Sequence, residues 1–287
     1  MKTIFSTLDY TILTPVVTIS DCQILVSRVL ALRDLVPTLP SLAAICIPAG
    51  LVQGVSSKLL GTTIQTATVV NFPLGQSTLI TTLQEVEEAI HHGAQEIDLV
   101  FPLSQFLCGE KEASIIDYVF QVKKRCRQRY LKTIIQSDEL EARFPLPEAI
   151  QKIARVSHLA LCGGSDMIKT STGKGSGGAS LIAATTMQFV AMHFQQHSPY
   201  TKIIGHSPGI KYSGGISNAE QSLAYLALHR KYLGENAASP SRLRFGASSL
   251  SSSLLEKLVE SDPILNERFH SQQIPYTYLS NLTRETY

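Results

Sequence analysis

The sequence predicts an α/β protein of the (β/α)8 TIM-barrel class. Short β-rich runs alternate with helical patterns along the chain, which is typical of a parallel sheet covered by helices. There are eight such runs, and eight strands close this barrel. Charged residues stand in or just after the apolar runs, where barrel enzymes carry their polar groups at the carboxyl ends of strands. An open doubly wound sheet has a similar pattern, but the count and these placements favour the barrel.

The expected strands are short, and four of them are nearly continuous apolar runs, as strands buried on both faces should be. In chain order the strands comprise residues 8–12, 43–47, 66–71, 96–100, 132–136, 166–169, 203–211 and 243–246. Helices are expected between them over residues 21–35, 78–92, 113–129, 146–161, 180–193 and 218–233. Capping residues support several of these starts: Ser20 or Asp21 for the first helix, and Asn218 with Gln221 for the last.

The domain prediction is a single catalytic barrel over residues 1–261 and a C-terminal tail over 262–287, where the chain becomes more polar. The 25 Lys and Arg residues nearly balance 23 Asp and Glu, so no nucleic-acid partner is expected. The chain shows neither a signal-peptide apolar region nor a run of 18 apolar residues. A cytoplasmic protein with a small-molecule ligand and no membrane partner is therefore expected.

The cysteines and histidines predict neither disulfides nor a metal site. The five cysteines are scattered without a C-x-x-C pair, so reduced thiols packed as small hydrophobic groups are expected. The eight histidines are spread between the predicted helices and the tail.

Lys169 ends a short apolar run and is followed by a glycine-rich segment. An amine with an ordinary pKa near ~10.4 is protonated at neutral pH, whereas burial and a neighbouring cation favour the neutral, nucleophilic form. Lys211, on the next strand, is the candidate for that cation, since adjacent strands run about 4.8 Å apart. The pair suits Schiff-base chemistry. The alternative is that one or both lysines only pair with buried carboxylates.

Asp98 lies inside an apolar strand, with Glu96 two residues earlier on the same face. A carboxylate beside Lys211 suits a proton shuttle, because Schiff-base formation and enamine protonation both need an acid or base within reach. The alternative for Asp98 is a salt bridge to Lys132. For Asp9, on the first strand, a supporting role in the site and a plain capping role are both open.

Three glycine- and hydroxyl-rich segments, 172–174, 213–215 and 246–249, follow the last three predicted strands. Barrels commonly bind phosphate with the loops after the last strands and the N-terminus of a short helix. Each glycine pair alone is more often a turn, but together the segments predict one phosphate site.

Motifs along nearly the whole chain match one family. They are LDYTIL, AAICI, ATVVNFPLG, EIDLVFPL, KTIIQSDEL, DMIKTSTGKGSGGAS, IKYSGGIS, RFGASS and the terminal Tyr287, with IKTSTG the most specific. On these motifs the sequence resembles deoxyribose-phosphate aldolases. These are class I aldolases that cleave 2-deoxy-D-ribose 5-phosphate to acetaldehyde and D-glyceraldehyde 3-phosphate, without a cofactor, in deoxyribonucleoside catabolism.

The resemblance implies roles for individual residues. Lys169 matches the Schiff-base lysine, Lys211 the second lysine that lowers its pKa, and Asp98 the proton-relay aspartate. The other matched positions are Asp9 and Lys132 as polar supports, Thr172, Gly173, Lys174, Gly214, Gly215, Gly246, Ser248 and Ser249 on the phosphate loops, Cys46 and Asn71 lining the pocket, and Tyr287. Tyr287 is a candidate lid residue, for which an untethered terminus is the alternative.

Three departures from the family pattern stand out. Ser217 follows SGGI where the family usually has arginine, which removes a positive charge near the phosphate. Residues 206–209 lengthen the approach to Lys211, and residues 136–138 replace a stretch that more often reads Glu-Thr-Gly. Two alternatives to the implied activity therefore remain: a class I aldolase with altered phosphate or acceptor preference, and a catalytically silent sugar-phosphate-binding barrel. A homodimer is the expected assembly.

Overall fold

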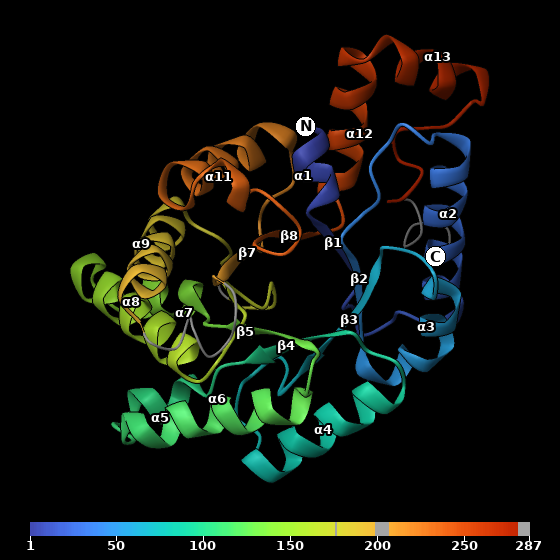
Figure 1. The fold of residues 1–287 in the computed structure, drawn as a ribbon. Coiled ribbons are helices and arrows are strands. Elements are labelled where there is room, and N and C mark those ends of the chain that lie inside the picture. Colours follow the sequence, from blue (N-terminus) through green and yellow to red (C-terminus); the bar gives the residue numbers. More distant parts are fainter. Residues whose placement is uncertain (176, 199–206, 281–287) are drawn as a thin grey trace.

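The computed structural model describes residues 1–175, 177–198 and 207–280. Over these residues the strands form a closed parallel barrel in the order of the sequence, with helices around its outside (Figure 1). The (β/α)8 prediction is therefore confirmed. The strands are β1 (Leu8–Thr11), β2 (Ala44–Ile47), β3 (Gln65–Val70), β4 (Glu96–Val100), β5 (Tyr130–Ile134), β6 (Met167–Lys169), β7 (Gly209–Ser213) and β8 (Leu243–Ala247).

The helices between and after the strands are α1 (Lys2–Ser6), α2 (Ile19–Leu35), α3 (Gln53–Leu59), α4 (Leu79–His91), α5 (Leu103–Leu107), α6 (Glu112–Cys126), α7 (Ser137–Arg143), α8 (Leu146–Cys162), α9 (Leu181–His197), α11 (Ala219–Leu233), α12 (Leu250–Ser261) and α13 (Pro263–Ser271). Short 3-10 helices cover Ala49–Leu51 and Glu235–Ala237. None of the helices in the described ranges has the length and apolar character that crossing a membrane would require.

Two strands differ from the sequence prediction by more than one residue at an end. β5 begins two residues earlier than expected and ends at Ile134, because Gln136 takes a left-handed conformation with φ 56° and α7 starts at the next residue. β7 begins at Gly209, directly after Pro208, which has no amide hydrogen to donate to the ladder. Residues 203–206 of the expected strand lie outside the described residues. Lys132 and Lys211 are thus central in their strands.

The first predicted helix also begins earlier. Thr18 caps α2: its side chain accepts a hydrogen bond from the Asp21 amide, and the Asp21 carboxylate accepts one from the Thr18 amide. The N-cap of α2 is therefore Thr18, and not Ser20 or Asp21 as the sequence predicted.

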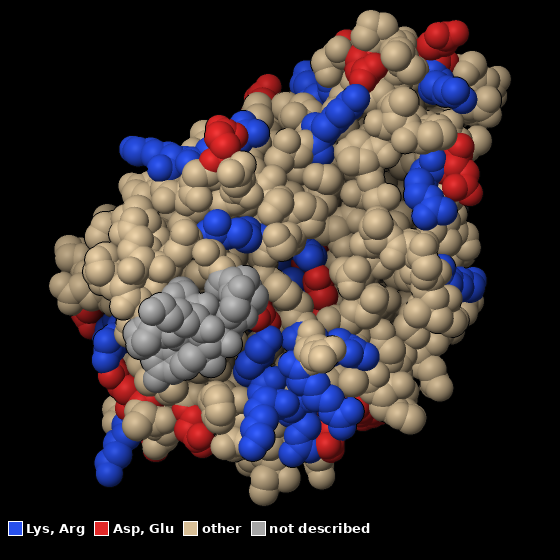
Figure 2. Space-filling view, viewed as in Figure 1, with Lys and Arg blue, Asp and Glu red and all other residues tan. Residues whose placement is uncertain are grey.

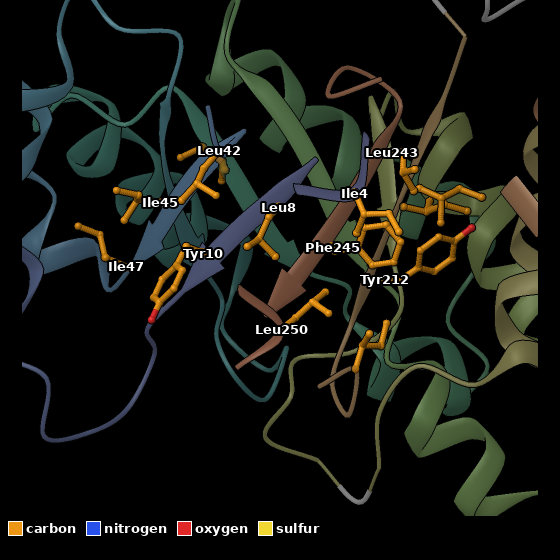
Figure 3. Close-up of a cluster of buried hydrophobic side chains, with 14 of the residues drawn as sticks. Ile4, Leu8, Tyr10, Leu42, Ile45, Ile47, Tyr212, Leu243, Phe245 and Leu250 are labelled. Carbon is orange, nitrogen blue, oxygen red and sulfur yellow. The ribbon is translucent and has the colours of Figure 1, made fainter. Parts of the chain in front are cut away.

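Side chains alternate along each strand between the hydrophobic core under the helices and the interior of the barrel. Leu8, Tyr10, Ile45, Ile47, Leu243 and Phe245 leave the barrel wall on its outer side, where they pack under the helices (Figure 3). Their neighbours in sequence therefore point inward. On β2 and β3 the inward side chains Ala44, Cys46, Ala67 and Val69 form a small apolar cluster of their own. Most other strands contribute charged side chains.

The described part of the segment after α12, residues 262–280, packs against the rest of the protein. Phe269 of α13 and Leu279 are 2% and 1% exposed, so apolar burial holds the segment down. The Leu279 carbonyl accepts a hydrogen bond from Tyr10, and Arg28 of α2 donates to the Tyr278 carbonyl. The boundary between a barrel domain and a tail at 262, and the fold-over of the last residues, stay predictions.

Candidate active site

The two lysines singled out in the sequence are neighbours inside the barrel. Lys169 on β6 lies in register with Lys211 on β7. The two residues are 1% and 0% exposed. Both amines meet one carboxylate oxygen: Asp98 Oδ2 accepts from Lys169 Nζ at 2.9 Å and from Lys211 Nζ at 2.8 Å.

The other oxygen of Asp98 binds a third lysine. Lys132 Nζ donates to Asp98 Oδ1 at 2.8 Å, and the two residues are register partners on β4 and β5. The salt bridge considered as the alternative for Asp98 is therefore present together with the contacts to Lys169 and Lys211. A single aspartate joins all three amines, so its carboxylate is placed to exchange protons with either Lys169 or Lys211.

Asp9 belongs to the same cluster and caps no helix. Its Oδ2 lies 2.7 Å from Lys211 Nζ and 3.3 Å from Lys132 Nζ. Its Oδ1 accepts a hydrogen bond from the Arg244 guanidinium. Asp9 is completely buried, so these cations are what keep its charge tolerable.

Arg244 and Glu96 complete the cluster, and sequence reasoning gave neither of them a role. Arg244 donates to Glu96 Oε2 at 3.0 Å and to Oε1 at 2.6 Å, a bidentate pair. Lys132 Nζ lies 2.7 Å from Glu96 Oε2. The available signals were an arginine inside an apolar strand, two residues before Gly246, and a glutamate on the face of Asp98.

The charges of this cluster do not cancel if every group is ionised. In the described barrel interior, four basic side chains face three carboxylates: Lys132, Lys169, Lys211 and Arg244 against Asp9, Glu96 and Asp98. One basic group in excess, in a dry site, favours the neutral form of whichever amine is least well paired. Lys169 contacts only Asp98 among the acids, whereas Lys211 and Lys132 each contact at least two.

The pKa directions follow the same division. Burial lowers the pKa of Lys169 below its ordinary value, and the Lys211 cation acts in the same direction against the attraction of Asp98. Burial would also lower the pKa of Lys211, but Asp9 and Asp98 outweigh it and the pKa is raised. Burial opposes ionisation of Asp98 as well, yet Lys132, Lys169 and Lys211 hold its pKa well below the usual range. Of the two neighbouring amines, Lys169 is therefore the one whose pKa is shifted toward the neutral form, and it lies beside the Lys211 ammonium and the Asp98 carboxylate.

Cys46 lies at the apolar side of this cluster. It is completely buried among Ala44, Ala67 and Val69, and burial raises the pKa of its thiol. A protonated thiol in such surroundings serves as packing.

Gly246 gives Lys211 the space it occupies. A Cβ at Gly246 would lie 2.8 Å from Lys211 Cε and 2.9 Å from Ser213 Cβ, both closer than real contacts allow. The glycine is thus needed for the lysine and not for a special backbone angle, since its φ is not positive.

Replacing Gly246 by alanine is expected to lower kcat/KM for the reaction that the sequence resemblance implies by roughly 10²-fold, because the Lys211 amine is displaced from Asp98 and Lys169. Steady-state kinetics would measure this. Gly50→Ala is the matched control, since nothing lies within 4 Å of its added Cβ, and its rate should equal that of the parent. An equal rate for Gly246→Ala would show that Lys211 does not need its present position.

The loops after β6 and β7 are fixed to each other above the lysines. Ser171 Oγ donates to the Ser213 carbonyl, and Ser213 Oγ donates to the Ser171 carbonyl. The Gly214 carbonyl accepts from the Ala179 amide. A Cβ at Gly178 would stand 2.4 Å from Gly214 C, so the two backbones touch in a way that only glycine permits.

The expected phosphate residues gather at the carboxyl ends of neighbouring strands. Gly173, Gly214 and Gly215 have φ of 70°, 89° and 75° in the loops after β6 and β7. Ser248 and Ser249 lead from β8 into α12, and Ser249 makes no side-chain capping bond at the N-terminus of this helix, an end that favours anions. Lys174, next to Gly173, is exposed.

A cleft of about 570 Å³ opens beside these loops, between the loops after β3, β4, β5 and β6. Thr172 and Lys174 line it, and Asn71 does not. The Asn71 amide instead donates to the Val100 carbonyl and to Tyr118, and its carbonyl accepts from the Ser77 amide. The polar side-chain atoms of Asn71 thus hold the loop after β3, and its pocket-lining role stays a prediction.

The departures from the family pattern have different outcomes. Ser217 is exposed and its amide donates to the Gln221 side chain, so no cation replaces the missing arginine at this position. Asp138 is 5% exposed, and burial raises its pKa to about 6. His206 and the proposed lid residue Tyr287 lie outside the described residues.

Comparisons with known proteins agree with this geometry. Residues 17–249 match the model of the family described as DeoC/LacD family aldolase. Deoxyribose-phosphate aldolase of Agrobacterium fabrum is 37% identical over 223 residues, which are 77% of this chain and 79% of that protein. Deoxyribose-phosphate aldolase of Homo sapiens is 36% identical over 74% of this chain, but the match spans only 63% of the human protein.

Solved structures share the fold at lower identity. The tetrameric deoxyribose phosphate aldolase of Aeropyrum pernix superposes with a TM-score of 0.65 at 19% identity, covering 91% of this chain and 93% of that one. A chain from Toxoplasma gondii ME49 superposes with a TM-score of 0.74 at 20% identity, covering 94% of both. With the match over most of the sequence and a lysine pair inside the barrel, the chain belongs to the DeoC/LacD family of aldolases.

Proposed function

We propose that this aldolase cleaves 2-deoxy-D-ribose 5-phosphate to acetaldehyde and D-glyceraldehyde 3-phosphate through a Schiff base on Lys169. The observation that carries the proposal is the buried Lys169 amine, with its pKa lowered, beside Lys211 and Asp98. The names of the similar aldolases from Agrobacterium fabrum and Homo sapiens support the choice of substrate.

The proposed steps use groups that lie together in the barrel interior. The neutral Lys169 amine adds to the C1 aldehyde carbon, and loss of water from the resulting carbinolamine leaves an iminium. The C3 hydroxyl then gives up its proton, the C2–C3 bond breaks, and the iminium takes up the electron pair as an enamine. Asp98, held between Lys169 and Lys211, is placed to carry the protons of dehydration and of enamine protonation at C2. Hydrolysis releases acetaldehyde and restores the amine, so the chemistry needs no cofactor.

The phosphate would bind at the loops after β6, β7 and β8, where Gly173, Gly214 and Ser249 offer amides and a hydroxyl. Binding energy from this remote group orients the reacting carbons. Lys132 and Asp9 support the site through their pairs with Asp98 and Lys211.

Reductive trapping tests the proposal. Borohydride added to the protein with deoxyribose 5-phosphate is expected to fix the substrate on Lys169, and mass spectrometry of the digest would locate it. An adduct on another residue would contradict the role of Lys169, and no adduct at all would leave the silent phosphate-binding barrel as the better explanation.

A second candidate is the same chemistry with weaker selection for phosphate, and Ser217 is the observation that favours it. Rates with deoxyribose and its 5-phosphate separate the two, since a small ratio means that the loops do not select. A homodimer and a cytoplasmic location remain our predictions for this protein. The tetrameric relative from Aeropyrum pernix makes a self-association measurement worthwhile.

A further inference from the structure

The charged cluster reaches well beyond the lysines, toward the opposite end of the barrel. Arg244 and Glu96 line a cavity of about 450 Å³ at the amino-terminal ends of the strands, together with residues that precede β2, β3 and β8. Figure 2 looks onto this face, and a hollow near its centre shows basic and acidic atoms side by side. Both residues are only 4% exposed, so their charges act within the barrel interior with little screening by solvent.

Within the described residues, the Arg244 and Glu96 side chains form no hydrogen bond or ion pair with Lys169, Lys211 or Asp98, the groups that the proposed reaction uses directly. Asp98 binds the two reacting lysines, and Arg244 touches none of them. Yet Arg244 shares Asp9 with Lys211, and Glu96 shares Lys132 with Asp98. Arg244 is therefore linked to Lys211 through the Asp9 carboxylate, and Glu96 is linked to Asp98 through the Lys132 amine. A change of charge at Arg244 or Glu96 would act on Lys169 through these groups.

We propose that Arg244 and Glu96 are positioning residues that set the charge balance of the barrel interior, so that Lys169 is the one basic group left without a carboxylate of its own. The inference rests on the proposed function. With three permanent cations against three carboxylates, the interior is neutral when Lys169 carries no charge. In this account the net charge of all seven ionisable groups makes Lys169 reactive, and the Lys211 cation is only one part of that net charge.

The groups that face this interior come from seven of its strands. They are Asp9 on β1, Cys46 on β2, Glu96 and Asp98 on β4, Tyr130 and Lys132 on β5, Lys169 on β6, Lys211 on β7 and Arg244 on β8. From β3, Ala67 and Val69 face the same space. Burial raises the pKa of both the Cys46 thiol and the Tyr130 phenol, so these two stay neutral and leave the charge count unchanged.

The sign of each perturbation follows from the count. Removing the Arg244 cation leaves one uncompensated carboxylate charge, which favours protonation of Lys169 and should move its titration to higher pH. Removing the Glu96 charge leaves an excess cation, which disfavours protonation of Lys169 and should move its titration to lower pH. Removing both charges restores the balance.

The test compares Arg244→Met, Glu96→Gln and the double variant, using pH profiles of kcat/KM with deoxyribose 5-phosphate. The acidic limb is expected to move up by about one pH unit in Arg244→Met, down by about one unit in Glu96→Gln, and back toward the parent value in the double variant. Arg244→Lys keeps the charge and should keep the limb in place even if its rate falls. Borohydride trapping across the same pH range would give the titration of Lys169 without relying on turnover.

A purely structural role for the pair would lower the rate at every pH without shifts of opposite sign, and that outcome overturns the inference. If Arg244→Met does not fold, Glu96→Gln, which preserves shape, and Arg244→Lys still decide it. Failure of the proposed function is distinguishable, since it would show as absence of any Lys169 adduct in the unmodified protein.

Discussion

Replacing Lys169 by leucine is expected to abolish aldol cleavage, lowering kcat/KM by about 10⁴-fold or more. The reason is that no other described amine combines a lowered pKa with a contact to the relay carboxylate. Lys132 and Lys211 both have raised pKa values and stay protonated. Steady-state kinetics with deoxyribose 5-phosphate, together with reductive trapping, would measure the loss.

The control for this variant is Lys124→Leu, which removes an exposed lysine near the end of α6 and should leave kinetics unchanged. Circular dichroism and thermal unfolding would establish that the Lys169→Leu barrel is intact, as expected for an apolar side chain of smaller size in a buried position. Retention of more than about one hundredth of the parental rate would mean that another group acts as the nucleophile.

Replacing Lys211 by leucine should lower kcat/KM by about 10²- to 10³-fold at neutral pH and move the acidic limb of the profile to higher pH. The Lys211 cation lowers the pKa of Lys169, so its removal lets that pKa rise and a larger fraction of the amine stays protonated. Asp9 and Asp98 also lose a partner, which strengthens the attraction of Asp98 for a charged Lys169.

The rate of this variant should therefore recover in part as the pH is raised, which a merely misfolded site would not do. Lys211→Met, with an unbranched side chain, controls for shape, since Gly246 leaves little room at this position. A profile with unchanged limbs would remove Lys211 from the activation of Lys169.

Strands were predictable where apolar character was continuous and the ends were marked by turns. β4 was expected at 96–100 and is found at Glu96–Val100. The strands at β5 and β7 were displaced because their limits depend on backbone features with weak sequence signals. Gln136 in a left-handed conformation is one, since only a few per cent of non-glycine residues adopt it.

Candidate site residues were predictable where a charged residue interrupts an apolar strand, as with Asp98, or where the family motif is specific, as with Lys169. Arg244 was missed because its contacts are electrostatic and involve residues of two other strands. Asn71 shows an ambiguity of the sequence signal, because a polar residue at a strand end satisfies backbone groups as readily as it faces a ligand.

The reciprocal hydrogen bonds between Ser171 and Ser213 restrict the distance between Lys169 and the proposed phosphate loop, and so the length of substrate that fits. Lys169 and Gly173 are four residues apart on one continuous segment, so their Cα atoms are at most about 14 Å apart. Because that segment is tied to the next loop by Ser171 and by the contact of Gly178 with Gly214, the span cannot easily stretch. Under the proposed function, the separation between the carbon that is attacked and the phosphate that is held is thus set within a single stretch of chain, which favours sugar phosphates of one length.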